Sequence, residues 1–225
     1  MKFYPLLLVL ALAACAPKNK QKPEMKTEPV DLVALLDTVW NREQLLLRSR
    51  DSLSKIYGFE HALVQEKHEL YKKNHAINEK KILALLDASG WPEKAVIKTQ
   101  GNWTIANVLQ HSDLEVRLKY LPLMKQAVLD GQLEARFLVR AQDRIATDRG
   151  ELQIYGGQMK YYPETKSFNL WPVFEPENID ARRTEIGLDS IAPFLKARFD
   201  FEWNLEEQKQ RTAEFIKQKE SQEKE

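Results

Sequence analysis

The sequence is almost without cysteine: Cys15 is the one cysteine among 225 residues. No disulfide bond can form within such a chain, so packing alone must hold the core together. The sequence also lacks an excess of either charge, because 34 Lys and Arg residues against 33 Asp and Glu residues give a formal net charge of +1. A nucleic-acid-binding protein typically carries a strongly basic face, so we expect no nucleic-acid partner.

The apolar run near the start of the sequence is too short to cross a bilayer. A transmembrane helix needs about 20 apolar residues, whereas this run extends from Phe3 to Ala14. A basic residue, Lys2, precedes it. A charged start followed by a short apolar segment is typical of a secretory signal peptide. We therefore expect residues 1–14 to be a signal peptide and not a membrane span.

The signal peptide runs into Leu12-Ala13-Ala14-Cys15, which resembles the lipobox of bacterial lipoproteins. In such proteins the cysteine thiol accepts a diacylglyceryl group, and several acyl chains on one residue give stable anchoring. Lipidation also explains a lone thiol in a secreted protein. The alternative is an ordinary secretory signal whose cleavage site contains a cysteine. The resemblance implies a lipid anchor to a membrane at Cys15.

The residues after Cys15 indicate which membrane. The residue after Cys15 is Ala16, not the aspartate that would resemble an inner-membrane retention signal. Lys18 and Lys20 are basic, whereas some surface-exported lipoproteins have an acidic run after the cysteine. By this resemblance we expect the periplasmic face of the outer membrane. In an organism with a single membrane, its outer leaflet takes that place.

Composition divides the rest of the chain into three segments. Residues 15–29 are rich in Lys, Pro and Gln, which predicts a solvated tether behind the lipidated cysteine. Residues 204–225 are mostly Glu, Lys and Gln and predict a charged tail or helix extension. Residues 30–203 are left as a single domain with a sizeable core.

Helical periodicity dominates this domain. The fold class that we predict is mainly α, a multi-helix domain with one small β-hairpin near residues 152–173. Apolar stripes, caps and glycine stops predict a helix from about Leu32 to Leu47, a second from Asp51 or Ser52, a third ending at Gly90, a fourth capped by Asn102, two more ending at Gly131 and Gly150, and helices after Asn178 and from Asp189. Aromatic, β-prone segments at Gln153–Tyr162 and Phe168–Val173 predict the two strands.

Several polar residues lie on the apolar faces of the predicted helices. Glu43 and Gln44 continue the stripe of the first helix, and Asn78 precedes the apolar residues of the third. A buried carboxylate needs a partner, because its desolvation is otherwise costly. Candidate partners are Arg48, Arg144, Arg182 and Arg183. The structural alternative is an ion pair or a partly exposed edge.

His111 follows Gln110 and precedes Ser112-Asp113 at the end of a predicted helix. One hypothesis makes His111 a general base oriented by a carboxylate, or a metal ligand together with Asp113. The alternative is structural: Ser112 and Glu115 form a capping box, and His111 lies at a helix C-terminus, where positive charge is favoured. A metal site needs further ligands to which the sequence does not point, so we expect neither a metal ion nor a cofactor.

Two further patterns carry polar side chains. His61, His68 and His75 repeat every seven residues, which places them on one helix face too far apart to share a metal ion and predicts a solvated face. In Gln153-Ile154-Tyr155-Gly156-Gly157-Gln158, alternation places Gln153 and Tyr155 on one face before a Gly-Gly bend. Such a bend lets the backbone approach a ligand or a neighbouring helix closely.

The order of these motifs resembles an uncharacterised bacterial family, one of the domains of unknown function, from about Val30 to Leu195. The matching residues are Glu43, Gln44 and Arg48; Asn78; Gly90, Trp91 and Pro92; Gln110, His111, Ser112 and Asp113; Asp143 and Arg144; Gln153, Tyr155, Gly156, Gly157 and Gln158; and Asn178, Asp180, Arg182, Arg183, Gly187 and Leu188. Glu43, Ser112 and Gly157 replace the family's usual Asp, Ala and Thr. The resemblance implies a fold and no known reaction.

Two functional hypotheses remain. The first is a non-catalytic envelope module that binds a ligand or partner between the helices and the hairpin. It is favoured because the sequence has no nucleophile or metal motif. The second is an envelope hydrolase with His111 as base, Asp113 or Asp143 as the orienting carboxylate, and Arg144 and Gln153 as oxyanion or substrate contacts.

Overall fold

The computed structural model describes residues 31–163 and 166–223, which belong to one compact unit, Asp31–Glu225. The predicted signal peptide, Cys15 and the tether lie outside the described residues. Within the described part, no helix has the length and apolar character needed to cross a membrane.

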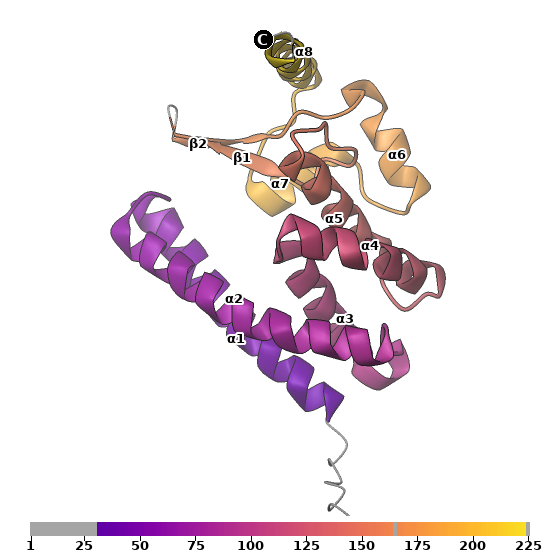
Figure 1. The fold of residues 1–225 in the computed structure, drawn as a ribbon. Helices are drawn as coiled ribbons and strands as arrows, with labels where there is room; N and C mark the ends of the chain where they lie inside the picture. The colour runs from indigo at the N-terminus through magenta and orange to yellow at the C-terminus, as the bar shows by residue number, and fades with distance from the viewer. Residues whose placement is uncertain (1–30, 164–165, 224–225) are drawn as a thin grey trace, which may run out of the picture. The chain divides into compact units, whose positions relative to one another are not determined.

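The described residues form eight α-helices, one 3-10 helix and one two-stranded sheet (Figure 1). This confirms the predicted fold class, a mainly α domain with one hairpin. In chain order the elements are α1 (Leu32–Tyr57), α2 (Ala62–Ser89), α3 (Lys94–His111), α4 (Leu114–Leu129), α5 (Ala135–Asp148), β1 (Met159–Tyr162), β2 (Ser167–Leu170), η1 (Pro176–Asn178), α6 (Ile179–Glu185), α7 (Ile191–Phe199) and α8 (Leu205–Gln222).

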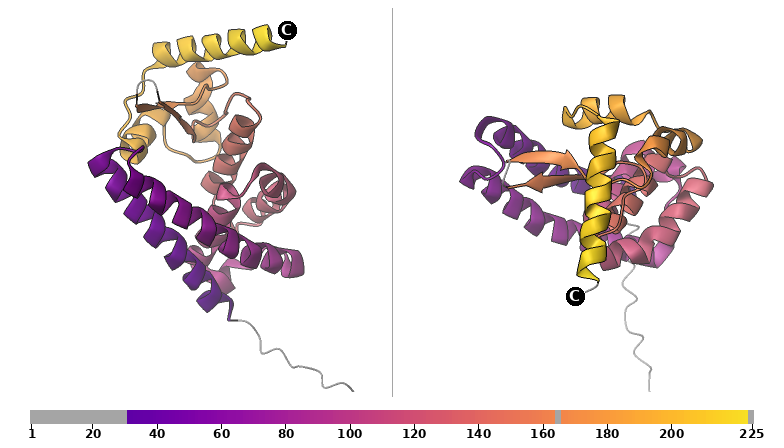
Figure 2. Two further views of the ribbon diagram at one scale, coloured as in Figure 1. Left: turned by 60° about the vertical axis from the view of Figure 1, so that its left-hand side comes forward. Right: turned by 90° about the horizontal axis from the view of Figure 1, so that it is seen from above.

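Helices α1 and α2 form a long antiparallel pair, visible in Figures 1 and 2. The side chain of Asp31 caps α1 by accepting a hydrogen bond of 3.1 Å from the Ala34 N–H. The prediction that a second helix begins at Asp51 or Ser52 is wrong, because α1 continues through both residues. Helix α1 is capped at its C-terminus by Gly58, whose φ of 82° is accessible to glycine at little cost. Asp and Ser therefore do not end a helix whose apolar face stays in register with a neighbour.

The main core lies where α1 to α5 meet. Its fully buried side chains include Leu36 and Val39 of α1, Ile82 of α2 and Leu109 of α3. Burying each such side chain stabilises the fold by about 1.5–3 kcal/mol. These residues lie on the apolar stripes read from the sequence, so the stripes identified the core.

Helix α3 is kinked, and Asn102 is not its cap. Lys98 has non-helical dihedral angles, with φ 59° and ψ −175°. The Asn102 side chain donates to the Lys98 carbonyl at 2.9 Å and accepts from Trp91 Nε1–H at 2.8 Å. Asn102 therefore bridges the kink to the loop before α3, instead of starting a helix as predicted.

A second apolar cluster, built from residues such as Leu170, Val173, Ile179 and Ile191, lies under the hairpin. Strands β1 and β2 pair antiparallel. The hairpin is confirmed but its strands are shorter than predicted, and Gln153 pairs with Val173 as an isolated parallel bridge. Polar side chains hold these flanking segments, as the site below shows.

The predicted charged tail is helix α8, which lies across the hairpin end of the molecule (Figure 2). Thr212 anchors it to Val173: its hydroxyl donates to the Val173 carbonyl at 3.1 Å and accepts from the Val173 N–H at 3.2 Å. The rings of Phe215 and Trp171 pack edge to face at 5.5 Å. Helix α8 thus packs on the domain through a narrow stripe of residues that includes Thr212 and Phe215.

The hairpin reaches the turn between α1 and α2 (Figure 1). Phe59 in that turn lies 5.1 Å from the ring of Tyr161 and 5.7 Å from the ring of Phe168. Such ring pairs stabilise by about 0.5–1.5 kcal/mol beyond their buried area. This aromatic contact bounds one side of the space between the helix pair and α5.

Candidate functional site

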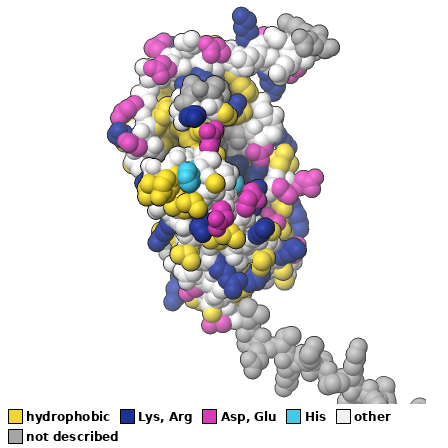
Figure 3. Space-filling view, turned by 90° about the vertical axis from the view of Figure 1, so that its left-hand side faces the viewer, with side chains coloured by type: hydrophobic (Ala, Val, Ile, Leu, Met, Phe, Trp, Pro, Cys, Tyr) yellow, Lys and Arg dark blue, Asp and Glu magenta, His cyan; other side chains and the backbone are white. Residues whose placement is uncertain are grey.

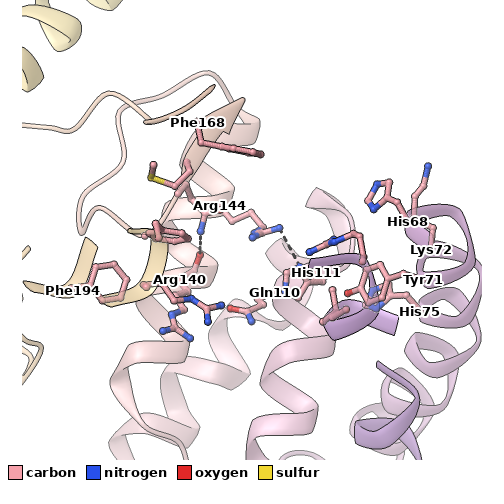
Figure 4. Close-up of a pocket in the computed structure, with 17 residues that line it drawn as sticks. His68, Tyr71, Lys72, His75, Gln110, His111, Arg140, Arg144, Phe168 and Phe194 are labelled. Atoms are coloured by element: carbon pink, nitrogen blue, oxygen red, sulfur yellow. Dashed lines mark hydrogen bonds between the residues drawn. The ribbon is translucent and has the colours of Figure 1, made fainter. Parts of the chain in front are cut away.

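A cavity of 570 Å³, here called the central cavity, lies between the α1–α2 pair and the wall made by α5, the hairpin and α7 (Figure 4). Cavities of this size hold small-molecule ligands in many proteins. It is lined by Leu47, Arg50, His68, Tyr71, Lys72, His75, Gln110, His111, Arg140, Arg144, Gly157, Gln158, Met159, Phe168, Phe194, Arg198 and Phe199.

The lining of the central cavity is cationic. Five of its side chains are Lys or Arg, and no Asp or Glu is among the lining residues. Arg50 and Lys72 have partners just outside, with Arg50 pairing with Asp51 at 2.6 Å and Lys72 with Glu69 at 2.7 Å. Figure 3, by contrast, shows basic and acidic side chains interspersed on the face near the α1–α2 turn. The imbalance of charge is therefore a property of the cavity.

Three other cations of the lining have no such partner. Within residues 31–163 and 166–223, no carboxylate lies within ion-pair distance of Arg140, Arg144 or Arg198. Burial, and next the charge of Arg198, lowers the pKa of Arg140 to about 10. Burial also lowers the pKa of Arg144. Both stay protonated at neutral pH, so like charges gather here without compensation.

Arg144 is the most informative of these side chains. Its Nη1 lies 3.4 Å from His111 Nδ1, and its Nε is buried without a hydrogen-bond partner among the described residues (Figure 4). An unsatisfied buried donor costs about 1–3 kcal/mol, and more when it is charged. An acceptor oxygen, from a ligand or from water, removes this cost.

His111 is neutral in this surrounding. Burial, followed by the charge of Arg144, holds the pKa of His111 well below its usual range. Because a guanidinium can only donate, Nδ1 accepts and we assign the ring proton to Nε2. His111 then offers a donor and no free basic nitrogen, which argues against the predicted role of general base.

Asp113 does not orient His111 in the structure. Its carboxylate caps α4, accepting from the Val116 N–H at 2.9 Å. The predicted capping box is also wrong, because the Ser112 hydroxyl donates to the Val108 carbonyl at 2.9 Å. The cap thus falls one residue later than predicted.

Asp143 is fully buried and binds backbone. Its Oδ1 accepts from the N–H groups of Ile154 and Tyr155 at 2.8 and 2.9 Å, and its Oδ2 accepts from Gly157 at 2.8 Å. Burial raises the pKa of Asp143 to about 6, and the three backbone donors act in the opposite direction. The carboxylate is therefore charged at pH 7 and holds the loop after α5.

The two glycines in that loop are explained by close neighbours. A Cβ on Gly156, whose φ is +76°, meets Ile191 Cδ1 at 2.6 Å. A Cβ on Gly157 meets Asp143 Oδ2 at 3.2 Å. The close approach expected of the Gly-Gly bend is thus to the protein itself, and Gly157 still reaches the cavity lining.

Gln153 is not an oxyanion contact. Its Nε2 donates to the carbonyls of Trp171 at 2.7 Å and Gln158 at 3.1 Å, and its Oε1 accepts from the Gln158 N–H at 2.8 Å. Of the two glutamines, Gln158 lines the central cavity. Gln153 fixes the backbone that positions it.

Arg182 and Arg183 brace the same loop from α6. Arg183 donates to the Tyr155 carbonyl at 2.6 Å, and Arg182 Nε donates to the Ile154 carbonyl at 3.3 Å. Neither guanidinium is among the groups that line the central cavity. Tyr155 is likewise outside the lining. These three residues support the site from behind.

Glu43 is buried as predicted, but the predicted arginine partners are wrong. Glu43 Oε1 accepts from Asn78 Nδ2 at 2.8 Å, and Oε2 lies 3.3 Å from His75 Nδ1. Both partners are on α2, so the carboxylate joins α1 to α2. Arg48 is exposed and Gln44 is half-buried.

The prediction of a solvated histidine face is wrong for His68 and His75. Both line the central cavity, and His75 is buried. The signal was available, because Tyr71, His75 and Asn78 continue the buried stripe of α2 at helical spacing. No sequence pattern marked Arg50, Lys72, Arg140 or Arg198, because their placement in the cavity depends on tertiary packing.

The ring of Tyr71 lies near the rings of His75 and His111. Its ring centroid is 5.7 Å from that of His75 and 6.4 Å from that of His111. Burial, and next the charge of Glu43, raises the pKa of Tyr71. Tyr71 therefore keeps its proton, and it adds no negative charge to the cavity. In the described residues, no group of three or more His, Cys, Asp or Glu side chains has the arrangement of a metal site.

A family model described as a family of unknown function (DUF6624) matches residues 68–202. The chain belongs to this family. The membership confirms the part of the resemblance that predicted a domain of unknown function. Its bounds are narrower than predicted, since Glu43, Gln44 and Arg48 lie outside the DUF6624 match. The match contains all of the central-cavity lining except Leu47 and Arg50. No curated protein and no solved structure matches the chain.

Proposed function

We propose that this protein is a cell-envelope lipoprotein anchored at Cys15, whose helical domain binds an anionic ligand in the central cavity. The observation that carries the binding proposal is the arginine wall. Arg140, Arg144 and Arg198 line a cavity without a lining carboxylate and have no ion-pair partner in the described residues.

An anion is the ligand class that such a wall selects. Arg140 and Arg144 are half-buried and Arg198 is exposed at the mouth of the cavity. Gathering like charges in a partly desolvated space is unfavourable, and the two half-buried guanidinium groups are stabilised by an opposite charge and by hydrogen bonds. Guanidinium groups bind carboxylate or phosphate oxygens through two parallel hydrogen bonds. Arg144 Nε has no hydrogen-bond partner among the described residues and is such a donor.

The envelope hydrolase has less support. Arg144 donates toward His111 Nδ1, and the carboxylates of Asp113 and Asp143 accept backbone hydrogen bonds. A general base needs a free acceptor atom near the substrate proton. We therefore favour binding over catalysis for this cavity.

The anchor proposal rests on the lipobox resemblance of residues 12–15 after the apolar run. It places the domain on a tether of residues 15–29, at the periplasmic face of the outer membrane. The ligand is then a component of the envelope or a molecule that enters it.

Thermal unfolding of the full chain in nonionic detergent tests the binding proposal. We compare inorganic phosphate with chloride at equal ionic strength. A ligand that binds only the native state, at a concentration ten times its dissociation constant, raises the Tm of a chain of this size by about 4 °C. We expect this increase for the wild type and its loss in Arg144→Gln.

The control variant is Arg149→Gln, which changes an exposed arginine close to α5 outside the cavity lining. It corrects for the general stabilisation that phosphate gives by exclusion from protein surfaces. Equal phosphate responses in the wild type, Arg144→Gln and Arg149→Gln would show that the cavity is not an anion site.

A further inference from the structure

We infer that the anion is a phosphate monoester whose organic group is apolar or aromatic. The arginines of the central cavity hold the phosphoryl group, and the phenylalanines of the hairpin and α7 contact the organic group. This inference rests on the proposed anion-binding function and specifies its ligand.

The amount of positive charge favours a phosphate over a carboxylate. Arg140, Arg144 and Arg198 remain without a carboxylate partner in the described part of the chain. A carboxylate brings one negative charge, whereas a phosphate monoester carries about −1.5 to −2 at pH 7 and offers three strong acceptor oxygens. The monoester thus neutralises more of the positive charge of these arginines and accepts hydrogen bonds from more of their N–H groups.

Donors reach the cavity from several elements. Arg140 and Arg144 are one turn apart on α5, His111 is at the end of α3, and Lys72 is on α2 (Figure 4). The neutral His111 presents an Nε2–H donor. A tetrahedral phosphoryl group can accept from donors on different sides at once, which a planar carboxylate does less well.

The central cavity is larger than a bare ion needs. Each displaced water accounts for about 30 Å³, and an inorganic phosphate replaces only a few of them. The central cavity measures 570 Å³. Most of its volume is therefore left for another part of the ligand.

That remaining volume is bounded by aromatic surface. Phe168 is 46% exposed and Phe199 is 38% exposed, although both line the cavity. Phe194 packs edge to face on Phe199 at 6.0 Å, and Met159 adds a flexible apolar contact. Figure 4 shows Phe168 and Phe194 on the side of Arg140 and Arg144. An apolar group attached to the phosphate is placed to cover these rings.

Isothermal titration calorimetry on the full chain in phosphatidylcholine nanodiscs tests the inference. The probes are phenyl phosphate, inorganic phosphate and benzoate. Burying the phenyl ring makes phenyl phosphate bind about tenfold tighter than inorganic phosphate. The larger charge makes phenyl phosphate bind about tenfold tighter than benzoate, which carries the same ring.

Two variants separate the walls of the cavity. Phe199→Ala removes most of the advantage of phenyl phosphate over inorganic phosphate and leaves phosphate binding in place. Its control is Phe174→Ala, since Phe174 is 42% exposed and outside the lining. Arg144→Gln weakens all three probes.

A third comparison separates two sources of the same chemistry, a free ester and a lipid headgroup. Phosphatidic acid in the nanodisc raises the apparent Kd of phenyl phosphate if the lipid occupies the cavity. An unchanged Kd assigns a free phosphate ester. Both results keep the monoester class.

The inference is overturned if phenyl phosphate binds no tighter than inorganic phosphate, or if benzoate matches it. If inorganic phosphate still stabilises the protein through Arg144 in that case, the anion-binding function stands and only the ligand class is wrong. If no anion binds in an Arg144-dependent way, both proposals are wrong.

Discussion

Arg144 and His111 show how one contact sets the behaviour of a site. The His111 ring lies 3.4 Å from the Arg144 guanidinium, so protonation of the ring places two positive charges side by side. The pKa of His111 is therefore low, with burial as the first cause and Arg144 as the second. An anion bound at Arg144 offsets that charge and favours the protonated ring.

Anion binding should consequently take up a proton. Since the pKa of His111 rises when the anion binds, affinity increases as the pH falls through the pKa of the bound state, stops increasing below the lower pKa of the free state, and is constant above both. Each unit of pKa increase gives up to about tenfold tighter binding at low pH. Sulfate is the suitable probe for titrations at pH 8.0 and pH 5.5, because its own charge is constant over that range.

His111→Gln should remove most of this pH dependence. The other titratable groups and charges near His111 are Arg144 of α5, His75 and Tyr71 of α2, Arg50 of α1 and Arg117 of α4. His68, whose pKa is also lowered by burial and by Arg50, accounts for the remainder. A pH profile identical in the wild type and His111→Gln would contradict the coupling.

At the scale of elements, buried carboxylates join segments that the sequence keeps apart. Glu43 joins α1 to α2 through Asn78, and Asp143 joins α5 to the loop before β1 through three backbone N–H groups. Each carboxylate is buried and accepts hydrogen bonds from buried donors, so its loss leaves those donors unsatisfied. The cavity wall depends on both joints.

Asp143→Asn should destabilise the fold by about 2–3 kcal/mol, because the amide turns a donor toward an N–H that needs an acceptor. Urea denaturation of the full chain measures the change. Asp130→Asn, at the exposed end of α4, is the matched control and should change stability by less than about 0.5 kcal/mol. Equal unfolding midpoints for the two variants would show that the loop does not depend on this carboxylate.

At the scale of the whole molecule, the proposed anchor and the cavity belong to different parts of the chain. Cys15 lies outside the described residues, and the cavity lies within the compact unit Asp31–Glu225. Lipidation should therefore affect location without affecting the cavity.

Cys15→Ser should release the protein from the membrane fraction and abolish incorporation of labelled palmitate, since each lipid chain contributes about 0.8 kcal/mol of membrane affinity per buried methylene. Ala16→Asp is the companion variant, expected to keep the label and shift the protein toward the inner membrane. Membrane association that survives Cys15→Ser would place the anchor elsewhere.

Much of the fold could be predicted from local pattern. The apolar stripes of α1 and α2, the stop at Gly90 and the hairpin follow from periodicity and turn chemistry that act within a few residues. Local rules failed at Asp51 and at Asn102, where packing of the apolar face and a kink outweigh capping preference.

The candidate site was predicted less well. The polar residues on apolar faces were found because a buried polar group interrupts a stripe, as Glu43 and Asn78 do. Their roles were not found, since Glu43 meets a residue 35 positions away and Arg140 reaches a cavity shared with α2 and α7. The sequence motifs predicted catalytic or substrate-binding roles for Asp143 and Gln153. In the structure both side chains hydrogen-bond to backbone groups and hold the loop in place.

Residue order and composition thus define the helical class, the N-terminal signal pattern with Cys15 and the set of polar residues that the core must accommodate. Which of those residues line one cationic cavity is a matter of tertiary packing. The physical reason is range: periodicity and capping act over one or two turns, while the partner of a buried charge is chosen by whichever elements pack against it.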